Sequence, residues 1–118
     1  MKIIGVIPAR WASTRFPGKV LADINGKPMI QCVWEGARQA KALTEVLIAS
    51  DDERVKEAAV RFGAKVVMTS PELASGTDRI AQAVRDMDAD IVVNIQGDEP
   101  LISGKVIDAL VAGLKADP

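Results

Sequence analysis

Four short apolar runs separated by helix-forming segments constrain the fold of this chain most strongly. The runs are Lys2–Ile7, Glu45–Ser50, Ala64–Met68 and Asp90–Ile95. Each is nearly continuous in apolar residues and rich in Val and Ile, which is typical of strands buried on both faces. Strands that alternate with helices favour a parallel sheet covered by helices on both sides, with right-handed crossovers. We therefore expect a three-layer α/β fold.

The segments between the runs carry helix signals. The Asn25-Gly26 pair indicates a turn, and Pro28 suits the first turn of a helix that we expect to continue to about Ala42. After the second run, Asp51 and Asp52 can cap a further helix. The apolar residues of that helix have amphipathic spacing and are Val55, Ala58, Ala59 and Phe62.

Glycine and hydroxyl residues mark the remaining helix ends. Gly63 is expected to end the second helix as a C-terminal cap. Ser75 or Thr77 can cap a third helix, and Ser103 can open a fourth. The apolar residues that these two helices are expected to bury are Ile80, Val84 and Met87 in the third and Val106, Ile107, Leu110, Val111 and Leu114 in the fourth.

Composition narrows the chemistry that is available. At 118 residues the chain suits one domain, and its net charge of −1 gives no general attraction to nucleic acid or an anionic membrane. The absence of histidine excludes a Ser-His-Asp or Cys-His mechanism and a histidine-based zinc site within this chain. Cys32 is the single cysteine, and no apolar stretch is long enough for a signal peptide or a membrane span. We therefore expect a cytoplasmic protein that binds neither nucleic acid nor a membrane.

A cationic segment, ARWASTRFPGKVL, follows the first expected strand. It carries Arg10, Arg15 and Lys19 with no acidic residue among them, and Ser13 and Thr14 add hydroxyl donors. In open parallel sheets, ligands bind in the crevice beyond the carboxyl ends of the strands. Guanidinium groups pair bidentately with phosphate oxygens, and an ammonium acts as a point charge. The segment therefore indicates a polyphosphate site, the alternative being a solvated basic loop.

An acidic motif, IQGDEP, follows the fourth expected strand at the same edge of the sheet. Asp98 and Glu99 beside Gly97 are hard oxygen ligands of the kind that Mg²⁺ prefers. A polar turn is the alternative interpretation, because Gly-Asp is common in turns. A cationic loop that faces a metal-binding acid across one crevice favours phosphoryl-type transfer, in which the metal neutralises developing charge.

Other candidates are weaker. The segment 75–79, SGTDR, can meet an anion or a base edge with its free amides, or it can simply cap a helix. Asp51 and Asp52 are better explained as helix caps than as metal ligands, and Cys32 as a core residue. Trp11 is either a packing lid or a stacking surface for a base.

Taken in order, PARWASTRFPGKVL, IASDD, VMTS, SGTDR and VNIQGDEPL resemble the 3-deoxy-D-manno-octulosonate cytidylyltransferases, also called CMP-Kdo synthetases. The resemblance covers essentially the whole chain. It implies a three-layer, Rossmann-like parallel sheet of the nucleotide-diphospho-sugar-transferase type. It also implies Mg²⁺ as cofactor and the reaction CTP + Kdo → CMP-Kdo + pyrophosphate, a step of lipopolysaccharide assembly.

The resemblance assigns roles to the positions that match the family's motifs. Arg15, Lys19 and Asp98 would be catalytic, with Asp98 as the Mg²⁺ ligand, and Gln96 would face the sugar. The positions assigned to nucleotide binding are Pro8, Ala9, Arg10, Ser13, Arg15, Lys19, Ser75, Gly76, Arg79, Gln96 and Asp98. The sugar's anomeric hydroxyl would attack the α-phosphorus of CTP, with pyrophosphate leaving.

Several alternatives stay open. The same residues suit a cytidylyltransferase for another acidic sugar, such as sialic acid or 8-amino-Kdo, or a module that binds CTP without catalysis. Members of the family are longer, and their second half supplies a further metal-binding aspartate, much of the sugar pocket and the interface of a homodimer. We therefore expect residues 1–118 to be the nucleotide-binding N-terminal part of a truncated cytidylyltransferase domain.

Overall fold

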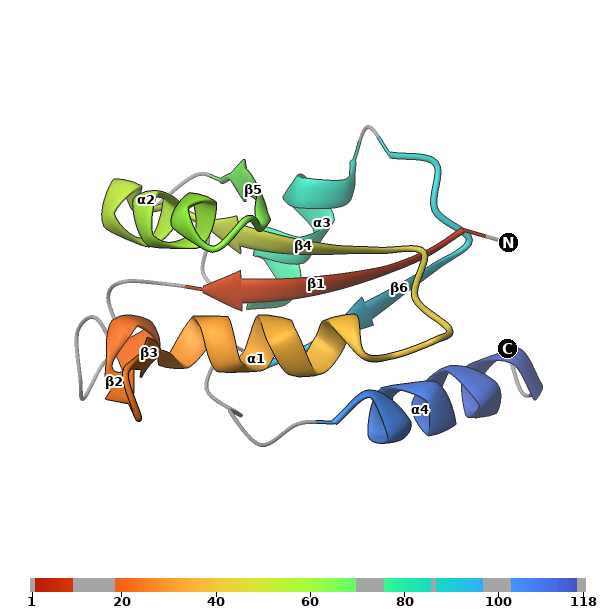
Figure 1. Ribbon diagram of the computed structural model, residues 1–118. Coiled ribbons are helices and arrows are strands. Elements are labelled where there is room, and N and C mark those ends of the chain that lie inside the picture. Colours follow the sequence, from red (N-terminus) through yellow and green to blue (C-terminus); the bar gives the residue numbers. More distant parts are fainter. Residues whose placement is uncertain (1, 10–18, 70–75, 86, 97–102, 117–118) are drawn as a thin grey trace.

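A computed structural model shows a four-stranded sheet between two layers of helices (Figure 1). The structure describes residues 2–9, 19–69, 76–85, 87–96 and 103–116, and of residues 19, 76–78 and 114–116 it describes the backbone alone. The strands are β1 (Ile3–Ala9), β4 (Glu45–Ser50), β5 (Lys65–Met68) and β6 (Ile91–Asn94), in the spatial order β5-β4-β1-β6. Every neighbouring pair is parallel. The predicted α/β fold and its four strands are confirmed.

The two faces of the sheet carry different helices. The helices are α1 (Met29–Arg38), α2 (Glu53–Arg61), α3 (Gly76–Val84) and α4 (Gly104–Ala116). Because successive side chains of a strand point to opposite faces, β1 contributes to two cores. Ile3 and Ile7 pack with residues of α1, α2 and α4, whereas Ile4 and Val6 pack with residues of α3. The helix between β5 and β6, α3, thus lies on the opposite face of the sheet from α1, α2 and α4.

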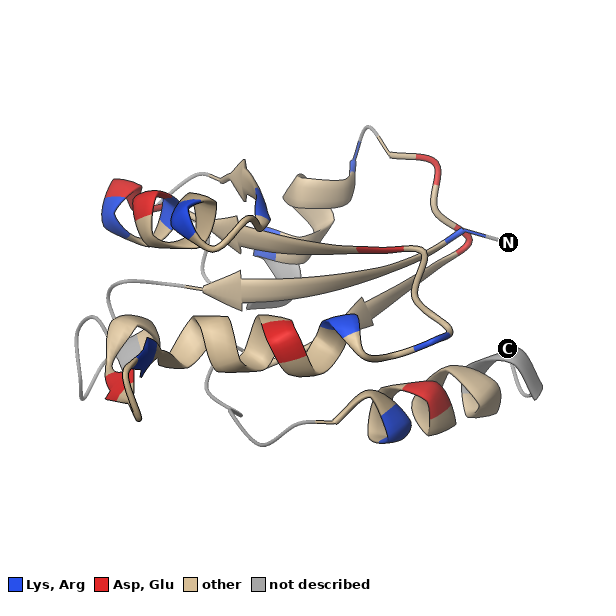
Figure 2. Cartoon of the chain, viewed as in Figure 1, with Lys and Arg blue, Asp and Glu red and all other residues tan. Residues whose placement is uncertain are grey.

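The centre of the sheet is apolar. Ile4, Val6 and Ile7 of β1 are fully buried, and Figure 2 shows no charged residue along this strand. The backbone of β1 is paired on both sides, with β4 through residues 4–9 and with β6 through residues 3–6. A strand buried on both faces and paired on both edges can only be apolar, which explains why its sequence is a continuous run.

A short hairpin between β1 and α1 was not predicted as strands. The strands β2 (Asp23–Ile24) and β3 (Lys27–Pro28) are antiparallel. Asn25 and Gly26 join them with positive φ values of 51° and 89°. Asn-Gly is the pair that favours such a two-residue hairpin turn. The expected turn is therefore confirmed, and its flanking residues pair across it.

The helix after this hairpin differs from the prediction at both ends. Pro28 lies outside the first turn of α1, because its ψ of 146° is extended and makes it the N-cap. The helix ends at Arg38, short of the expected Ala42. After Arg38 the backbone forms a tighter turn, in which the N–H of Ala40 donates to the carbonyl of Ala37 at 3.1 Å.

The later helices confirm most of the predicted signals. Asp52 caps α2 by accepting a hydrogen bond from the Arg54 backbone at 2.8 Å, and Gly63 follows the helix with a φ of 90°. The helix α3 begins at Gly76, so Thr77 lies inside it, and the expectation of Thr77 as its N-cap is wrong.

The expected core of the last two helices is only partly confirmed. In α4, Ile107 and Val111 are buried, but Val106 and Leu110 are 60% and 52% exposed, contrary to prediction. They lie off the stripe that faces α1. Met87 packs against the core as expected but lies beyond the end of α3. No helix in the described part of the chain is long and apolar enough to cross a membrane.

Candidate functional site

The carboxyl ends of three strands are joined by side-chain hydrogen bonds. Ser50 at the end of β4 donates from Oγ to the carbonyl of Ala9, the last residue of β1, at 2.7 Å. Thr69, directly after β5, donates to the carbonyl of Ser50 from its backbone N–H at 2.8 Å and from Oγ1 at 3.2 Å. Ser50 and Thr69 are both buried. Two hydroxyl side chains therefore fix the relative position of three strand ends.

A fully buried arginine completes this set of contacts. Arg79 lies in the first turns of α3 and has an exposed fraction of 0%. Its Nη1 donates to Oγ1 of Thr69 at 2.5 Å, and its Nη2 lies 3.5 Å from Oδ2 of Asp51. A buried charge is costly unless it is paired and hydrogen-bonded. The ends of β4 and β5 supply these partners.

The adjacent acids Asp51 and Asp52 have different roles. Asp52 caps α2 and also binds the side chain of Arg54, at 2.9 Å from Nε and 2.8 Å from Nη2. The hydrogen bond from Arg54 lowers the pKa of Asp52 below its ordinary value. Asp51 instead turns toward Arg79. The prediction of a cap is confirmed for Asp52, and sequence reasoning did not detect the pairing of Asp51.

Five of the predicted site residues lie wholly or partly in the described part of the chain at this edge. Pro8 is half-buried and Ala9 is fully buried; they end β1, in register with Ala49 and Ser50. Gly76 is the first residue of α3. Gln96, the second residue after β6, is exposed. Arg79 is the buried residue described above.

Of the remaining predicted residues, all but Lys19 fall outside the described part of the chain. They are Arg10, Ser13, Arg15, Ser75 and Asp98, and for Lys19 the backbone alone is described, as the first residue of the short 3₁₀ helix η1 (Lys19–Leu21). Their predicted contacts with nucleotide and metal stay predictions. The segment with Arg10, Ser13 and Arg15 follows β1 and the segment with Asp98 follows β6, and these two strands are parallel neighbours.

The proposed metal ligand is likewise a prediction. Within the described residues, no group of three or more Cys, Asp or Glu side chains is placed to hold a metal ion. The donor chemistry that suits Mg²⁺ lies in the sequence Gly97-Asp98-Glu99, whose carboxylates are hard oxygen donors. This donor set fits Mg²⁺, and no competing cluster is present in the described ranges.

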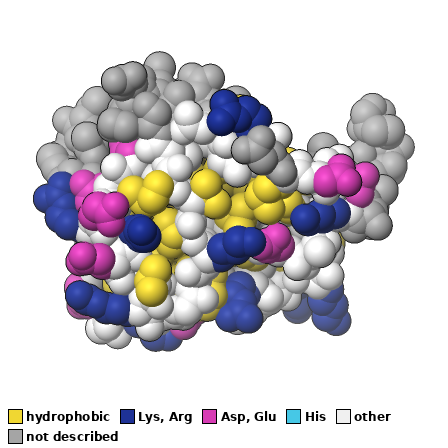
Figure 3. Space-filling model, turned by 90° about the horizontal axis from the view of Figure 1, so that it is seen from above, with side chains coloured by type: hydrophobic (Ala, Val, Ile, Leu, Met, Phe, Trp, Pro, Cys, Tyr) yellow, Lys and Arg dark blue, Asp and Glu magenta, His cyan; other side chains and the backbone are white. Residues whose placement is uncertain are grey.

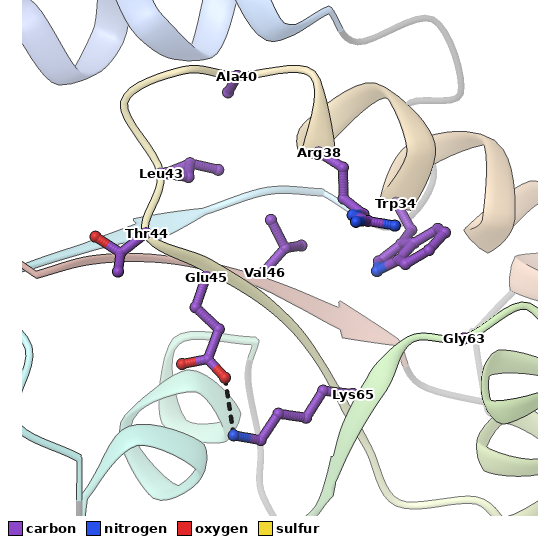
Figure 4. A pocket seen from close by; sticks show the side chains of 9 residues that line it. All are labelled: Trp34, Arg38, Ala40, Leu43, Thr44, Glu45, Val46, Gly63 and Lys65. Atoms are coloured by element: carbon purple, nitrogen blue, oxygen red, sulfur yellow. Dashed lines mark hydrogen bonds and ion pairs between the residues drawn. The ribbon is translucent and has the colours of Figure 1, made fainter.

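A cavity of about 400 Å³ lies at the opposite edge of the sheet (Figure 4). Glu45 and Lys65, the first residues of β4 and β5, form an ion pair there at 2.8 Å. The guanidinium of Arg38 lies 4.6 Å from the ring centroid of Trp34. The lining residues are Trp34, Arg38, Ala40, Leu43, Thr44, Glu45, Val46, Gly63 and Lys65. None is a predicted site residue, so this cavity is separate from the candidate site.

The described residues over α2, β5 and α3 form a surface of mixed character. Seen from above in Figure 3, hydrophobic side chains on this side are interrupted by charged ones. Val60 of α2 and Met68 of β5 are the large apolar residues most exposed there, at 57% and 37%. The carboxyl edge, with its buried polar contacts, is therefore the candidate site that the fold defines best.

Comparison with known proteins identifies the family. The family model described as "Cytidylyltransferase" matches residues 4–118, and the chain belongs to this family. A 3-deoxy-manno-octulosonate cytidylyltransferase of Bdellovibrio bacteriovorus is 54% identical over the whole chain, which covers 48% of that relative. An 8-amino-3,8-dideoxy-manno-octulosonate cytidylyltransferase of Shewanella sp. (strain W3-18-1) is also 54% identical, with 49% of its length covered.

A solved structure gives the same result. A CMP:2-keto-3-deoxy-manno-octonic acid synthetase complexed with CTP superimposes with a TM-score of 0.96 at 47% identity, covering 100% of this chain and 49% of that one. The chain thus spans about half the length of the relatives it matches. The nucleotidyltransferase-like fold expected from the sequence is confirmed.

Proposed function

We propose that the protein transfers a cytidylyl group from CTP to 3-deoxy-D-manno-octulosonate, giving CMP-Kdo and pyrophosphate. The observation that carries this proposal is the superposition of the whole chain on a synthetase complexed with CTP, at a TM-score of 0.96. In support, β1 and β6, which precede the cationic segment and the acidic motif, are neighbouring parallel strands, so both segments follow the carboxyl edge of the sheet. That is the edge at which open parallel sheets bind ligands.

Catalysis in this proposal is mainly a matter of position and charge. Lys19 and Arg15 bind the β- and γ-phosphates and stabilise the negative charge of the leaving pyrophosphate. Backbone amides at the end of β1 and the start of α3 orient the cytidine, with Ala9 and Gly76 at the two flanks. Gln96 positions the sugar so that its anomeric hydroxyl lies in line with the α-phosphorus.

Asp98 would hold the magnesium ion in this arrangement. When bound, Mg²⁺ supplies a positive charge that neutralises the phosphate oxygens and favours an ionised nucleophile. The product suits lipopolysaccharide assembly, and the single cysteine suits a reducing cytoplasm. We propose a homodimer for the complete protein, with the interface outside these 118 residues.

The test measures turnover of the complete protein bearing this chain. Pyrophosphate release is followed with CTP, Mg²⁺ and Kdo, and CMP-Kdo is identified by mass spectrometry. Lys19→Ala should lower kcat/KM by roughly 100-fold or more, because a preorganised charge contact is worth that much. Lys41→Ala, an exposed lysine without a predicted role, is the control and should leave kcat/KM within twofold. A loss of less than threefold for Lys19→Ala would refute the role given to this residue.

A second candidate substrate is 8-amino-Kdo. The relatives that act on this sugar, by name, are as similar to the chain as those named for Kdo. The same assay with Kdo, 8-amino-Kdo and sialic acid in parallel distinguishes them by their kcat/KM values. Tight CTP binding by calorimetry with no product from any sugar would instead favour a CTP-binding module without catalysis.

A further inference from the structure

A continuous series of buried hydrogen bonds crosses the candidate site. It runs from the carbonyl of Ala9 to Ser50, from the carbonyl of Ser50 to Thr69, and from Oγ1 of Thr69 to Arg79. Arg79, Ser50 and Thr69 are 0%, 0% and 7% exposed. The series links the three elements β1, β4 and α3 through Thr69, the residue after β5. We refer to Ser50, Thr69 and Arg79 with Asp51 as the strand-end network.

The strand-end network joins residues on both sides of the segment 70–75. Residues 70–75 connect β5 to α3 and contain Ser75, and their described flanks are Thr69 and Gly76. Arg79, one helical turn into α3, donates to Thr69 at 2.5 Å. Thr69, which precedes residues 70–75, and Arg79, which follows them, are therefore hydrogen-bonded to one another through their side chains.

The same network reaches the cationic segment. Ala9 is the last residue of β1, and residues 10–18 with Arg10 and Arg15 follow it. The Oγ of Ser50 donates to the carbonyl of Ala9 at 2.7 Å, which is a short and therefore well-formed hydrogen bond. The network thus connects the flanks of both segments that we assign to the nucleotide.

Stability alone is a weak reason for such a network. Replacing a buried ion pair by well-packed apolar residues is often neutral or stabilising, so buried charge is poor evidence for stability. Buried hydrogen bonds between residues distant in the sequence do, however, restrict the arrangement of the elements they join. At this position the groups that the strand-end network joins are the strand ends that carry the nucleotide-binding segments.

We propose that Arg79 is a positioning residue that sets the relative placement of the two nucleotide-binding segments through Thr69 and Ser50. This inference rests on the proposed function and changes the role first expected for Arg79, which was contact with the nucleotide. It adds Ser50, Thr69 and Asp51 as residues on which CTP affinity depends. None of these three was predicted from the sequence to act on the nucleotide.

The test uses variants that disturb the network while leaving Arg79 in place. Thr69→Val is nearly isosteric but removes the hydroxyl that accepts from Arg79, and Ser50→Ala removes the donor to Ala9. Each should raise the Kd and the KM for CTP about tenfold, which corresponds to a loss of about 1.4 kcal/mol of CTP-binding free energy. Thr69→Ser keeps the hydroxyl and should restore the KM for CTP to within twofold of the wild type.

Thr44→Val is the matched control at the other edge of the sheet. Oγ1 of Thr44 accepts a hydrogen bond from the Ile3 backbone at 3.0 Å, so this variant also loses a strand-end hydrogen bond. It should lower the melting temperature to a similar extent and leave the KM for CTP within twofold. A merely structural role for the strand-end network would change stability alone in all of these variants.

The measurements are CTP titration calorimetry and steady-state kinetics on the complete protein. The KM for CTP and kcat are compared at a temperature at which circular dichroism shows every variant folded. Unchanged CTP affinity in Thr69→Val and Ser50→Ala would overturn the inference. If only Arg79→Lys lost affinity, direct contact of Arg79 with the nucleotide would replace it. Absence of CTP binding in the wild type would contradict the proposed function itself, which separates the two failures.

Discussion

The close packing of α4 on the end of α1 predicts opposite effects for two Gly→Ala changes in one helix. Gly104 is the first residue of α4 and faces the backbone that follows α1. A Cβ at Gly104 would lie 2.5 Å from the carbonyl carbon of Gln39 and 2.6 Å from the backbone nitrogen of Ala40. Ordinary contact begins at 3.4 Å, so the two segments must separate by about 0.9 Å. Both opposing atoms belong to the backbone and cannot rotate away.

The size of the effect follows from this displacement. Overpacking that shifts backbone typically costs about 1–3 kcal/mol. Alanine regains up to roughly 1 kcal/mol over glycine in a helix interior, and less at its first position. Gly104→Ala should therefore lower the free energy of unfolding by about 1–3 kcal/mol and the melting temperature by roughly 4 °C for each kcal/mol. Gly113→Ala, where nothing lies within 4 Å, should raise stability by about 0.5–1 kcal/mol.

Urea and thermal unfolding of the two variants, followed by circular dichroism, test this prediction. Turnover should fall in Gly104→Ala but not in Gly113→Ala, because the segment between β6 and α4 carries Asp98 and a shifted α4 moves one end of that segment. If Gly104→Ala were as stable as the wild type, or stabilised like Gly113→Ala, the close approach of α4 to the end of α1 would be refuted.

Three further predictions concern separate features. Asp108 accepts hydrogen bonds from two backbone N–H groups beyond the end of α1, at 3.1 and 2.8 Å. Asp108→Ala should therefore lower the free energy of unfolding, measured with urea, by about 1–3 kcal/mol. Replacement of the exposed Asp88 by Ala should change this free energy by less than about 0.5 kcal/mol. The hydrogen bond from Arg54 lowers the pKa of Asp52 in the folded protein. Ionised Asp52 therefore stabilises the fold fully at pH values above the unfolded-state pKa of ~3.9, and this contribution is lost as the pH falls through the lower folded-state pKa. Asp52→Asn, which still caps a helix, should remove that dependence from a pH series of melting temperatures, and an unchanged pH series would contradict the assignment. Removal of Mg²⁺ by EDTA should abolish turnover, and excess Mg²⁺ should restore it. Asp98→Asn should raise the Mg²⁺ concentration required for half-maximal rate. Full activity in EDTA would exclude a requirement for the metal.

Much of the fold could be predicted because its signals are local. The strands of the four-stranded sheet are largely apolar runs, and in the two central strands, β1 and β4, burial on both faces requires this pattern. The caps at Asp52 and Gly63 follow from the chemistry of single residues, since an aspartate accepts the first free amides and glycine tolerates a positive φ. The edge of the sheet to which we assign the candidate site follows from the parallel arrangement of the strands alone.

The features that the sequence analysis did not predict arise from contacts between segments that are distant in the sequence. Nothing near Arg79 in the sequence indicates that Thr69 and Asp51 surround it, because these residues come together only when β4, β5 and α3 pack. Similarly, α1 ends at Arg38 where the chain turns back toward the sheet and Asp108 of α4 binds the backbone beyond that turn. A buried hydroxyl at the end of an apolar strand, as at Ser50, is the signal that could have indicated the strand-end network.

The central claim is that one nucleotide binds between the segment after β1 and the segment after β6, at the carboxyl edge of the sheet. A crystal structure of the complete protein with CTP and Mg²⁺ tests it most directly. We predict the triphosphate between Lys19 and Asp98, with the metal on Asp98. CTP in the cavity lined by Trp34 and Arg38 at the opposite edge, or a triphosphate that contacts neither Lys19 nor Arg15, would contradict the claim.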